Sequence, residues 1–255
     1  MIMKPNILLV DIETAPLKAY TWGIWQQNIG INQIREPGYT LCWAAKWLGE
    51  DSMMFSSVHG DGKKKMVRQI HQLVNKADVV VHYNGTKFDM PILNQEFLQQ
   101  KLGPPSPHID IDLLRTVKQR FRFPSNKLDY VARVLKREGK VKNRGMDLWT
   151  ECMAGDDAAW IEMEEYNRKD VTLLEDVYHD LLPWIKNHPN VALWDVEQED
   201  KQCPQCGSTS IQKRGMAYTK TMVYQRYHCQ SCGAWSKART NNLPLEKKSN
   251  ILVGI

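Results

Sequence analysis

Short continuous runs of apolar residues dominate the first half of the chain and predict buried β-strands. The first run, NILLVDI, leads into a pair of acidic residues. The run ADVVVH is followed by Asn84-Gly85, a strong turn signal. Three further runs are bounded by polar or glycine-containing segments. The predicted strands are 6–12, 40–48, 53–58, 77–82 and 109–111.

Other segments repeat their apolar residues at the spacing of one helical face. The clearest is 63–76, where Met66, Ile70 and Leu73 fall on that face. The order of three strands, then alternating helices and strands, predicts a mixed α/β sheet flanked by helices. The predicted helices are 63–76, a segment after Gly85 that ends near 102, 113–120, 127–136 and 158–186.

The periodic pattern lapses after residue 187, which divides the chain into parts. Residues 1–187 are predicted to form the α/β domain, 188–201 a linker, and 202–255 a small domain with a basic tail. A chain of 255 residues, 42% of them hydrophobic, is long enough to bury such a core. It has no apolar run of 18 residues and no signal-peptide cleavage site, so we expect no membrane segment and a cytoplasmic location.

Charge is distributed unevenly along the chain. Residues 201–255 contain nine Lys or Arg side chains and one acid, Glu246, whereas the preceding part is slightly acidic. A basic section of this kind is typical of proteins that bind a polyanion such as nucleic acid. A solvated charged surface is the alternative.

Four carboxylates and one tyrosine are the candidate catalytic residues. Asp11 and Glu13 alternate at the end of the first strand, so both point to one face. Asp89 opens a helix, while Tyr166 and Asp170 lie one turn apart on the last helix. Carboxylates gather around cations, and two divalent metals can activate water for phosphodiester hydrolysis. Oxygen ligands favour magnesium or manganese.

Each of these patterns has a structural alternative. Asp89 precedes Pro91 and could cap its helix, and acidic pairs are common at strand ends. Asp110 and Asp112 compete with Asp89, but their strand-to-helix position favours a turn or a cap. His82 lies beside the turn, and we expect it to be a hydrogen-bonded histidine at the end of a strand and not a catalytic residue.

The segments DIET, NGTKFD and YNRKD together resemble the three exonuclease motifs of the DnaQ-like (DEDD) superfamily, which has an RNase H-like fold. The resemblance covers roughly 5–185 and is closest to exonuclease domains of the family B polymerase type, including stand-alone phage and bacterial versions. Tyr166 stands at the motif's tyrosine position, and no histidine lies within the eight residues before Asp170, which indicates the DEDDy branch.

The resemblance implies a role for each residue. Asp11 would bridge two Mg²⁺ or Mn²⁺ ions, Glu13 and Asp170 would complete the first site, and Asp89 would support the second. Tyr166 would orient the attacking water.

Three other residues are candidates for contact with substrate. Asn84 is implied to support a metal ligand or to position the substrate. Trp22 and Trp25 are candidates for stacking on unpaired bases, with packing in the core or in a lid as the alternative.

Four of the six cysteines form two CxxCG pairs, which predict one structural zinc ion in a ribbon. The spacer between the pairs is long enough for a hairpin through 211–214 and 222–227. A redox-active CxxC motif and ligation by His228 are the alternatives. The predicted ligands are Cys203, Cys206, Cys229 and Cys232.

Basic and aromatic residues are interleaved within the predicted ribbon. Lys213, Arg214 and Arg226 are the candidates for phosphate contacts, with tyrosines and a tryptophan nearby for base stacking. This composition favours a nucleic-acid interface.

The residues and the resemblance together predict a 3′→5′ exonuclease that removes nucleotides from DNA 3′ ends. The expected substrate is single-stranded DNA, and the expected setting is phage or bacterial replication or repair, with a DNA polymerase or other replication protein as partner. One alternative is a 3′→5′ exoribonuclease, since discrimination at the 2′-hydroxyl rests on few contacts. Another is a non-catalytic adaptor that docks a replication protein through the ribbon.

Overall fold

The computed structural model describes residues 4–137 and 144–253, which form two compact units. One unit consists of Asn6–Tyr178, and the other contains the described residues from His179 onward together with Lys4 and Pro5. Among the described helices, none combines the length and the apolar character that crossing a membrane requires.

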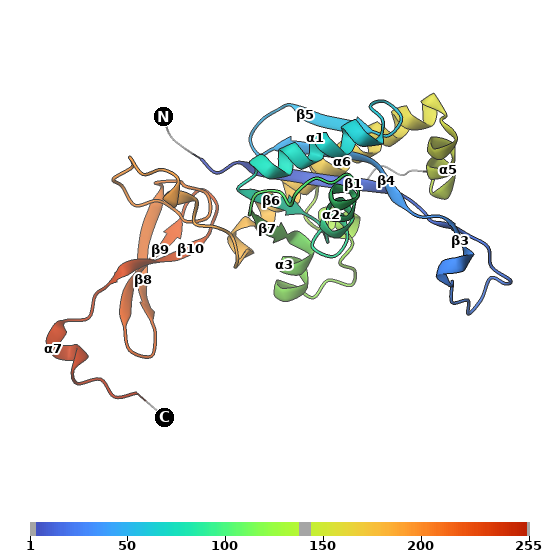
Figure 1. The fold of residues 1–255 in the computed structure, drawn as a ribbon. Helices are drawn as coiled ribbons and strands as arrows, with labels where there is room; N and C mark the ends of the chain where they lie inside the picture. The colour runs from blue at the N-terminus through green and yellow to red at the C-terminus, as the bar shows by residue number, and fades with distance from the viewer. Residues whose placement is uncertain (1–3, 138–143, 254–255) are drawn as a thin grey trace. The chain divides into compact units, whose positions relative to one another are not determined.

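The first unit is built on a five-stranded mixed sheet in the order β5-β4-β1-β6-β7 (Figure 1). β1 pairs antiparallel with β4 and parallel with β6. The sheet confirms the predicted mixed α/β class and all five predicted strands, with bounds that differ by a few residues. The strands are β1 (Ile7–Ala15), β4 (Tyr39–Trp47), β5 (Met53–Ser57), β6 (Val79–His82) and β7 (Ile109–Asp112).

β1 is longer than its apolar run, and this extension matters for the candidate site. The strand continues through Asp11 and Glu13 to Ala15, because β4 supplies pairing partners along this whole length. Glu13 pairs with Cys42, and a bulge follows between Glu13 and Thr14. The two acids therefore lie within a paired strand and not at its end.

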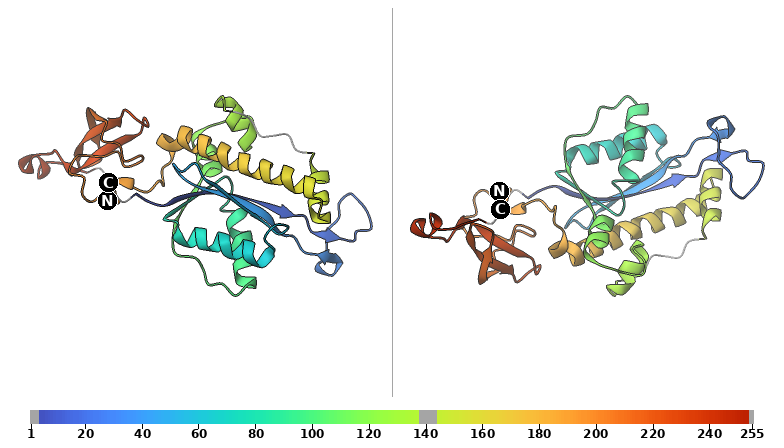
Figure 2. Two further views of the ribbon diagram at one scale, coloured as in Figure 1. Left: turned by 90° about the horizontal axis from the view of Figure 1, so that it is seen from above. Right: turned by 90° about the horizontal axis from the view of Figure 1, so that it is seen from below.

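Helices cover both faces of the sheet (Figure 2). α1 (Lys63–Lys76), as predicted, and α2 (Asp89–Gln99) pack on the face formed by Leu8, Val10 and Ile12. The opposite face contacts α5 (Met146–Ala154) and the long helix α6 (Asp157–Leu181). Since side chains alternate along a strand, Asp11 and Glu13 point toward the α6 face.

Of the remaining described helices in this unit, one matches its predicted bounds, two end earlier than predicted and one was not predicted. α3 (Leu113–Arg120) matches its prediction, and α4 (Leu128–Val134) is shorter than predicted. α6 ends at Leu181, because Pro183 cannot continue the helix, and a 3₁₀ turn, Leu182–Trp184, follows. α5 was not predicted: only two of its residues, Leu148 and Cys152, are fully buried.

The turn after β6 depends on a glycine. Asn84 has a positive φ of 72°, and the N–H of Gly85 donates to His82 Nδ1 at 3.1 Å. The Nε2 of His82 therefore carries the proton and donates to Asp110 at 3.2 Å, so this buried histidine is satisfied as expected.

Replacing Gly85 by alanine should destabilise the first unit by roughly 1–3 kcal/mol, because the packing at this turn leaves no room for a methyl group. A Cβ there would lie 2.3 Å from His82 Cγ. Urea unfolding measures the effect. Gly103→Ala is the matched control, since a Cβ at Gly103 meets no atom within 4 Å. Equal stability of the two variants would contradict this account of the turn.

The second unit contains a three-stranded antiparallel sheet in the order β10-β9-β8. β8 (Ile211–Tyr218) and β9 (Val223–Cys229) form the predicted hairpin, and β10 (Trp235–Asn241) was not predicted. A short helix, α7 (Leu245–Lys248), follows, and a 3₁₀ turn, Val191–Leu193, lies within the predicted linker. Among its described residues, this part of the chain has one buried cluster, Cys203, Cys229 and Ala234, and Tyr227 is buried as well.

Candidate metal centre

Three of the predicted carboxylates come together where β1 meets α6. Oxygen atoms of Asp11, Glu13 and Asp170 all lie within 4.8 Å of one another. Asp170 is almost fully buried, with 2% of its surface exposed. Removing carboxylates from water and placing them side by side is costly unless a cation neutralises them. The cluster therefore has the composition and spacing of a site for a divalent cation.

Asn167 connects the helix to the strand within this cluster. It is fully buried, and its Nδ2 donates to Asp11 Oδ2 at 2.8 Å. This hydrogen bond fixes the orientation of the Asp11 carboxylate. The sequence analysis missed Asn167, although its position three residues before Asp170 places both on one face of α6.

Asp89 approaches β1 separately and is not part of the three-carboxylate group. It is the first residue of α2, and its Oδ1 accepts the N–H of Ile12 at 3.3 Å. β6 pairs with β1 only as far as Leu9, so this N–H lies beyond the last β6 partner. The capping interpretation is wrong, because the α2 N-cap is Phe88 and no side chain caps it.

Burial has a large effect on the Asp89 carboxyl. Desolvation raises the pKa of Asp89 to about 6, against the opposing influence of His82 and of backbone N–H groups. A carboxylate held in such surroundings gains more from a nearby cation than an exposed one would.

The competing acids have structural roles. Asp112 caps α3 by accepting the N–H of Arg115 at 3.3 Å, and it also accepts the N–H of Asn84 at 3.0 Å. Asp110 accepts from His82. Both were expected to serve a turn or a cap.

Asn84 lies beside the carboxylate cluster. A cleft of about 530 Å³ is lined by Asp11, Asn84, Tyr83, Lys118 and Lys127, among others. The cleft is lined by two lysines and two acids, Asp11 and Asp129, and Asp11 connects it to the cluster.

Tyr166 is buried on α6, one turn before Asp170. Its ring meets that of Trp149 edge-on, with 6.0 Å between centroids, and it packs in the same cluster as Cys42 and Ala15. Because Cys42 is the strand partner of Glu13, the tyrosine lies close to the strand that carries the acids.

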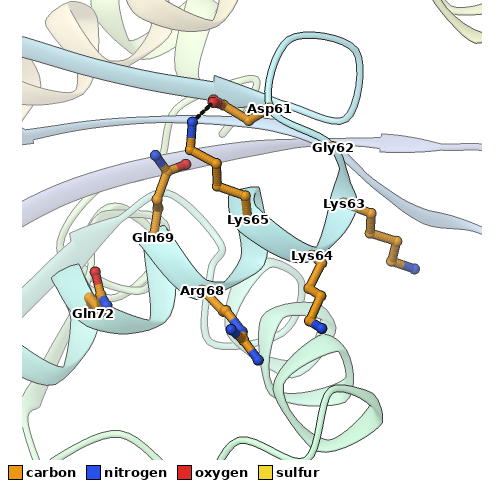
Figure 3. Close-up of a pocket in the computed structure, with 8 residues that line it drawn as sticks. All are labelled: Asp61, Gly62, Lys63, Lys64, Lys65, Arg68, Gln69 and Gln72. Atoms are coloured by element: carbon orange, nitrogen blue, oxygen red, sulfur yellow. Dashed lines mark hydrogen bonds and ion pairs between the residues drawn. The ribbon is translucent and has the colours of Figure 1, made fainter.

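A second hollow lies at the start of α1 and is strongly basic (Figure 3). It measures about 580 Å³, and Lys63, Lys64, Lys65 and Arg68 outnumber its one acid, Asp61. None of the clustered carboxylates lines it, so it is distinct from the candidate metal centre.

Trp22 and Trp25 are 99% and 83% exposed, so the expectation that they could pack in the core is wrong.

The four paired cysteines form a compact cluster in the second unit. Their sulfur atoms lie within 4.8 Å of one another, with Cys203–Cys232 at 3.6 Å and Cys206–Cys229 at 3.7 Å. A tetrahedral site with metal–sulfur bonds of about 2.3 Å has its sulfurs about 3.8 Å apart. The cluster fits a zinc ribbon.

Backbone groups around Cys229 favour its thiolate, whereas burial raises the pKa of Cys206 and of Cys232. Burial raises the pKa of Cys229, but the N–H groups of Cys232 and Ser231 and the neighbouring thiols lower it to about 7. His228 is not a member of the cluster. Its ring lies against Trp235, 4.6 Å between centroids, and its Nδ1 is 3.1 Å from Gln230 Nε2.

The register of the second sheet places two of the three basic candidates, Lys213 and Arg226, on different faces. Lys213 is opposite Tyr227, whereas Arg226 is opposite Lys237, so Lys213 and Arg226 point to different faces. Arg226 lies over the Trp235 ring at 4.8 Å, and its Nε donates to the carbonyl of Arg214 at 2.9 Å.

The family profile of the RNase_H superfamily matches residues 8–182, and the chain belongs to this superfamily. Membership of this superfamily and the carboxylate cluster together indicate that the protein is a nuclease. The structure is similar to the family B DNA polymerase of the hyperthermophilic archaeon Pyrobaculum calidifontis, with a TM-score of 0.53 and 17% identity. The similarity covers 70% of this chain and 25% of that polymerase, and at this identity it concerns the fold alone. No curated protein matches the chain.

Proposed function

We propose that the protein is a metal-dependent 3′→5′ exonuclease of the DEDDy type that removes nucleotides from DNA 3′ ends. The observation that carries the proposal is the convergence of Asp11, Glu13 and Asp170, with Asp89 beside the same strand. Superfamily membership supports a nuclease. The resemblance of the segments DIET, NGTKFD and YNRKD to the DnaQ-like exonuclease motifs supports the 3′→5′ direction.

In this proposal the acids hold two Mg²⁺ or Mn²⁺ ions. Asp11, Glu13 and Asp170 would hold one ion, and Asp11 together with Asp89 would hold the other. Bound divalent ions supply an activated water and stabilise the leaving oxygen. Asn167 keeps the Asp11 carboxylate in place through its 2.8 Å hydrogen bond, so that the ligand is preorganised.

The remaining groups position the reactants. The hydroxyl of Tyr166 orients the water that attacks the terminal phosphodiester. Asn84, with Lys118 and Lys127 in the cleft that includes Asp11, holds the last nucleotide and its phosphate. Hydrolysis releases a nucleoside monophosphate and leaves a new 3′-hydroxyl.

The cysteine cluster holds one structural Zn²⁺ in the proposal. Four thiolates fill a tetrahedral site, so no position remains for a catalytic water. Phosphate contacts by Lys213, Arg214 and Arg226 would give the ribbon a share in binding the nucleic acid. Replication or repair in a bacterial or phage-infected cytoplasm, beside a DNA polymerase, is the setting that we infer.

Two other functions are tested by the same assay. Single-stranded DNA and RNA of one sequence are labelled at the 5′ end and incubated with Mg²⁺, with Mn²⁺ or without metal. We expect a ladder that shortens from the 3′ end of the DNA, and none when the 3′ end is blocked. Preference for RNA would indicate an exoribonuclease. If neither DNA nor RNA is cut under any of these metal conditions, the protein is an adaptor and the proposal is overturned.

Replacing Tyr166 by phenylalanine should lower kcat roughly 100-fold, because only the hydroxyl that orients the water is lost. Metal affinity, measured by calorimetry, should remain unchanged. Tyr178→Phe is the control on the same helix and should retain activity. Loss of metal binding in the Tyr166 variant would contradict the assigned role.

A further inference from the structure

Exposed apolar side chains gather on the segment between β1 and β4. β2 (Lys18–Ala19) and β3 (Ile34–Glu36) pair antiparallel, and together with the loop between them they form an aromatic hairpin, residues 16–38, that projects from the sheet (Figure 1). Burying these side chains would remove a large apolar area from water. The most exposed are Tyr20, Trp22, Ile24, Trp25 and Ile31.

The base of the aromatic hairpin is fixed by hydrogen bonds. The Tyr20 N–H donates to the Gln33 carbonyl at 3.0 Å, and Gln33 Nε2 donates back to the Tyr20 carbonyl at 2.9 Å. The Gly30 N–H donates to Gln33 Oε1 at 2.7 Å, and Arg35 lies over the Tyr20 ring at 4.8 Å. The chain is thus held in a defined turn that presents Trp22 and Trp25 to solvent.

The aromatic hairpin is continuous with the carboxylate site. It follows β1, whose residues Asp11 and Glu13 belong to the cluster, after Ala15 pairs with Tyr39. The aromatic hairpin therefore begins at residue 16, three residues after Glu13 along the same stretch of chain.

The charge of the aromatic hairpin suits nucleic acid. No acidic residue lies between Glu13 and Glu36, and Lys18 and Arg35 are basic. Indole rings without neighbouring carboxylates can stack on bases and do not repel phosphates. Exposed tryptophans can also be covered by a protein partner, because aromatic residues are enriched in protein–protein interfaces. The only acid within the aromatic hairpin, Glu36, is paired with Lys18 at its base, 2.9 Å between Nζ and Oε2, so the loop that carries Trp22 and Trp25 has no carboxylate of its own. Continuity with the catalytic strand and this absence of acids from the loop favour nucleobases.

We propose that Trp22 and Trp25 stack on unpaired bases of the strand whose 3′ end enters the site. The inference rests on the proposed nuclease function and deepens it, because it assigns the aromatic hairpin as the surface that binds the unpaired part of the substrate strand. Stacking tolerates any base, so the aromatic hairpin grips the strand without sequence preference.

The test measures coupling between the tryptophans and the bases. Trp22→Ala/Trp25→Ala is compared with Trp22→Phe/Trp25→Phe, which keeps the rings, and with Leu98→Ala, an exposed apolar control on α2. All are made in full-length protein that carries Asp11→Asn, so that the DNA is not cut. Fluorescence anisotropy measures binding of labelled single-stranded DNA with an abasic site at successive positions from the 3′ end.

With both tryptophans present, an abasic site at a stacked position should weaken binding at least about fivefold. The alanine variant should bind normal and abasic strands alike, while the phenylalanine variant and Leu98→Ala should keep the discrimination. If the alanine variant discriminates as the tryptophan protein does, the proposal is overturned and a protein partner covers the rings. A different result is that the wild-type protein cuts no nucleic acid while binding still depends on the tryptophans and the bases as described. That result would overturn the proposed function and leave the stacking proposal standing.

Discussion

Replacing Asp11 by asparagine should lower the cleavage rate at least about 1,000-fold, because metal ions supply several kcal/mol of transition-state stabilisation. Asparagine keeps the shape of the side chain and an oxygen that can accept the hydrogen bond from Asn167 Nδ2. The fold should therefore survive while the charge that holds both metals is lost. Rates on single-stranded DNA at saturating Mg²⁺ measure the effect.

Asp51→Asn is the matched control, since Asp51 is an exposed acid in the turn between β4 and β5. It should cleave at the wild-type rate. Thermal unfolding of both variants shows whether folding is intact. An Asp11 variant that is folded and retains activity within tenfold of wild type would exclude this carboxylate as a shared metal ligand.

Removing zinc, or replacing Cys229 by serine, should unfold the second unit while the first stays folded. The described part of the ribbon buries only a cluster of three small residues and Tyr227, whereas structural zinc contributes roughly 10–16 kcal/mol of apparent binding free energy. The first unit has its own core around β1 and α1. Limited proteolysis of the full chain should therefore cut the region after residue 201 and spare the α/β unit.

Loss of the ribbon should also weaken nucleic-acid binding. Each phosphate contact that is lost removes roughly 0.7–0.9 from the log–log dependence of affinity on salt. Returning Zn²⁺ should restore both protection and binding to the wild-type chain, but not to the Cys229 variant. If the salt dependence does not change when the ribbon unfolds, the ribbon contacts a protein and not the substrate.

The strands and most helices could be predicted, because the buried residues of each one form a recognisable apolar pattern within a short stretch of sequence. α1 has Met66, Val67, Ile70 and Val74 buried at helical spacing, and its predicted bounds match the structure. β6 is buried on both faces and reads as a continuous apolar run. In such segments one short pattern determines the element.

Other elements could not be predicted, because tertiary contacts define them. β2 and β3 consist of two and three residues and pair only with each other. β10 is mostly polar and exists because β9 offers a free edge. Asn167 is an ordinary helical residue until α6 is placed against β1, where it contacts Asp11.

The same placement determines when the protein can become active during its synthesis. Asp11 and Asn167 are separated by 156 positions, so the carboxylate cluster does not exist until the chain has been made as far as α6 and that helix has docked on β1. A nascent chain that has folded only its first strands holds two of the three clustered acids and none of the residues from α6. Nuclease chemistry is thus tied to the docking of α6 on β1, and chains that end before α6 should leave nearby nucleic acid intact.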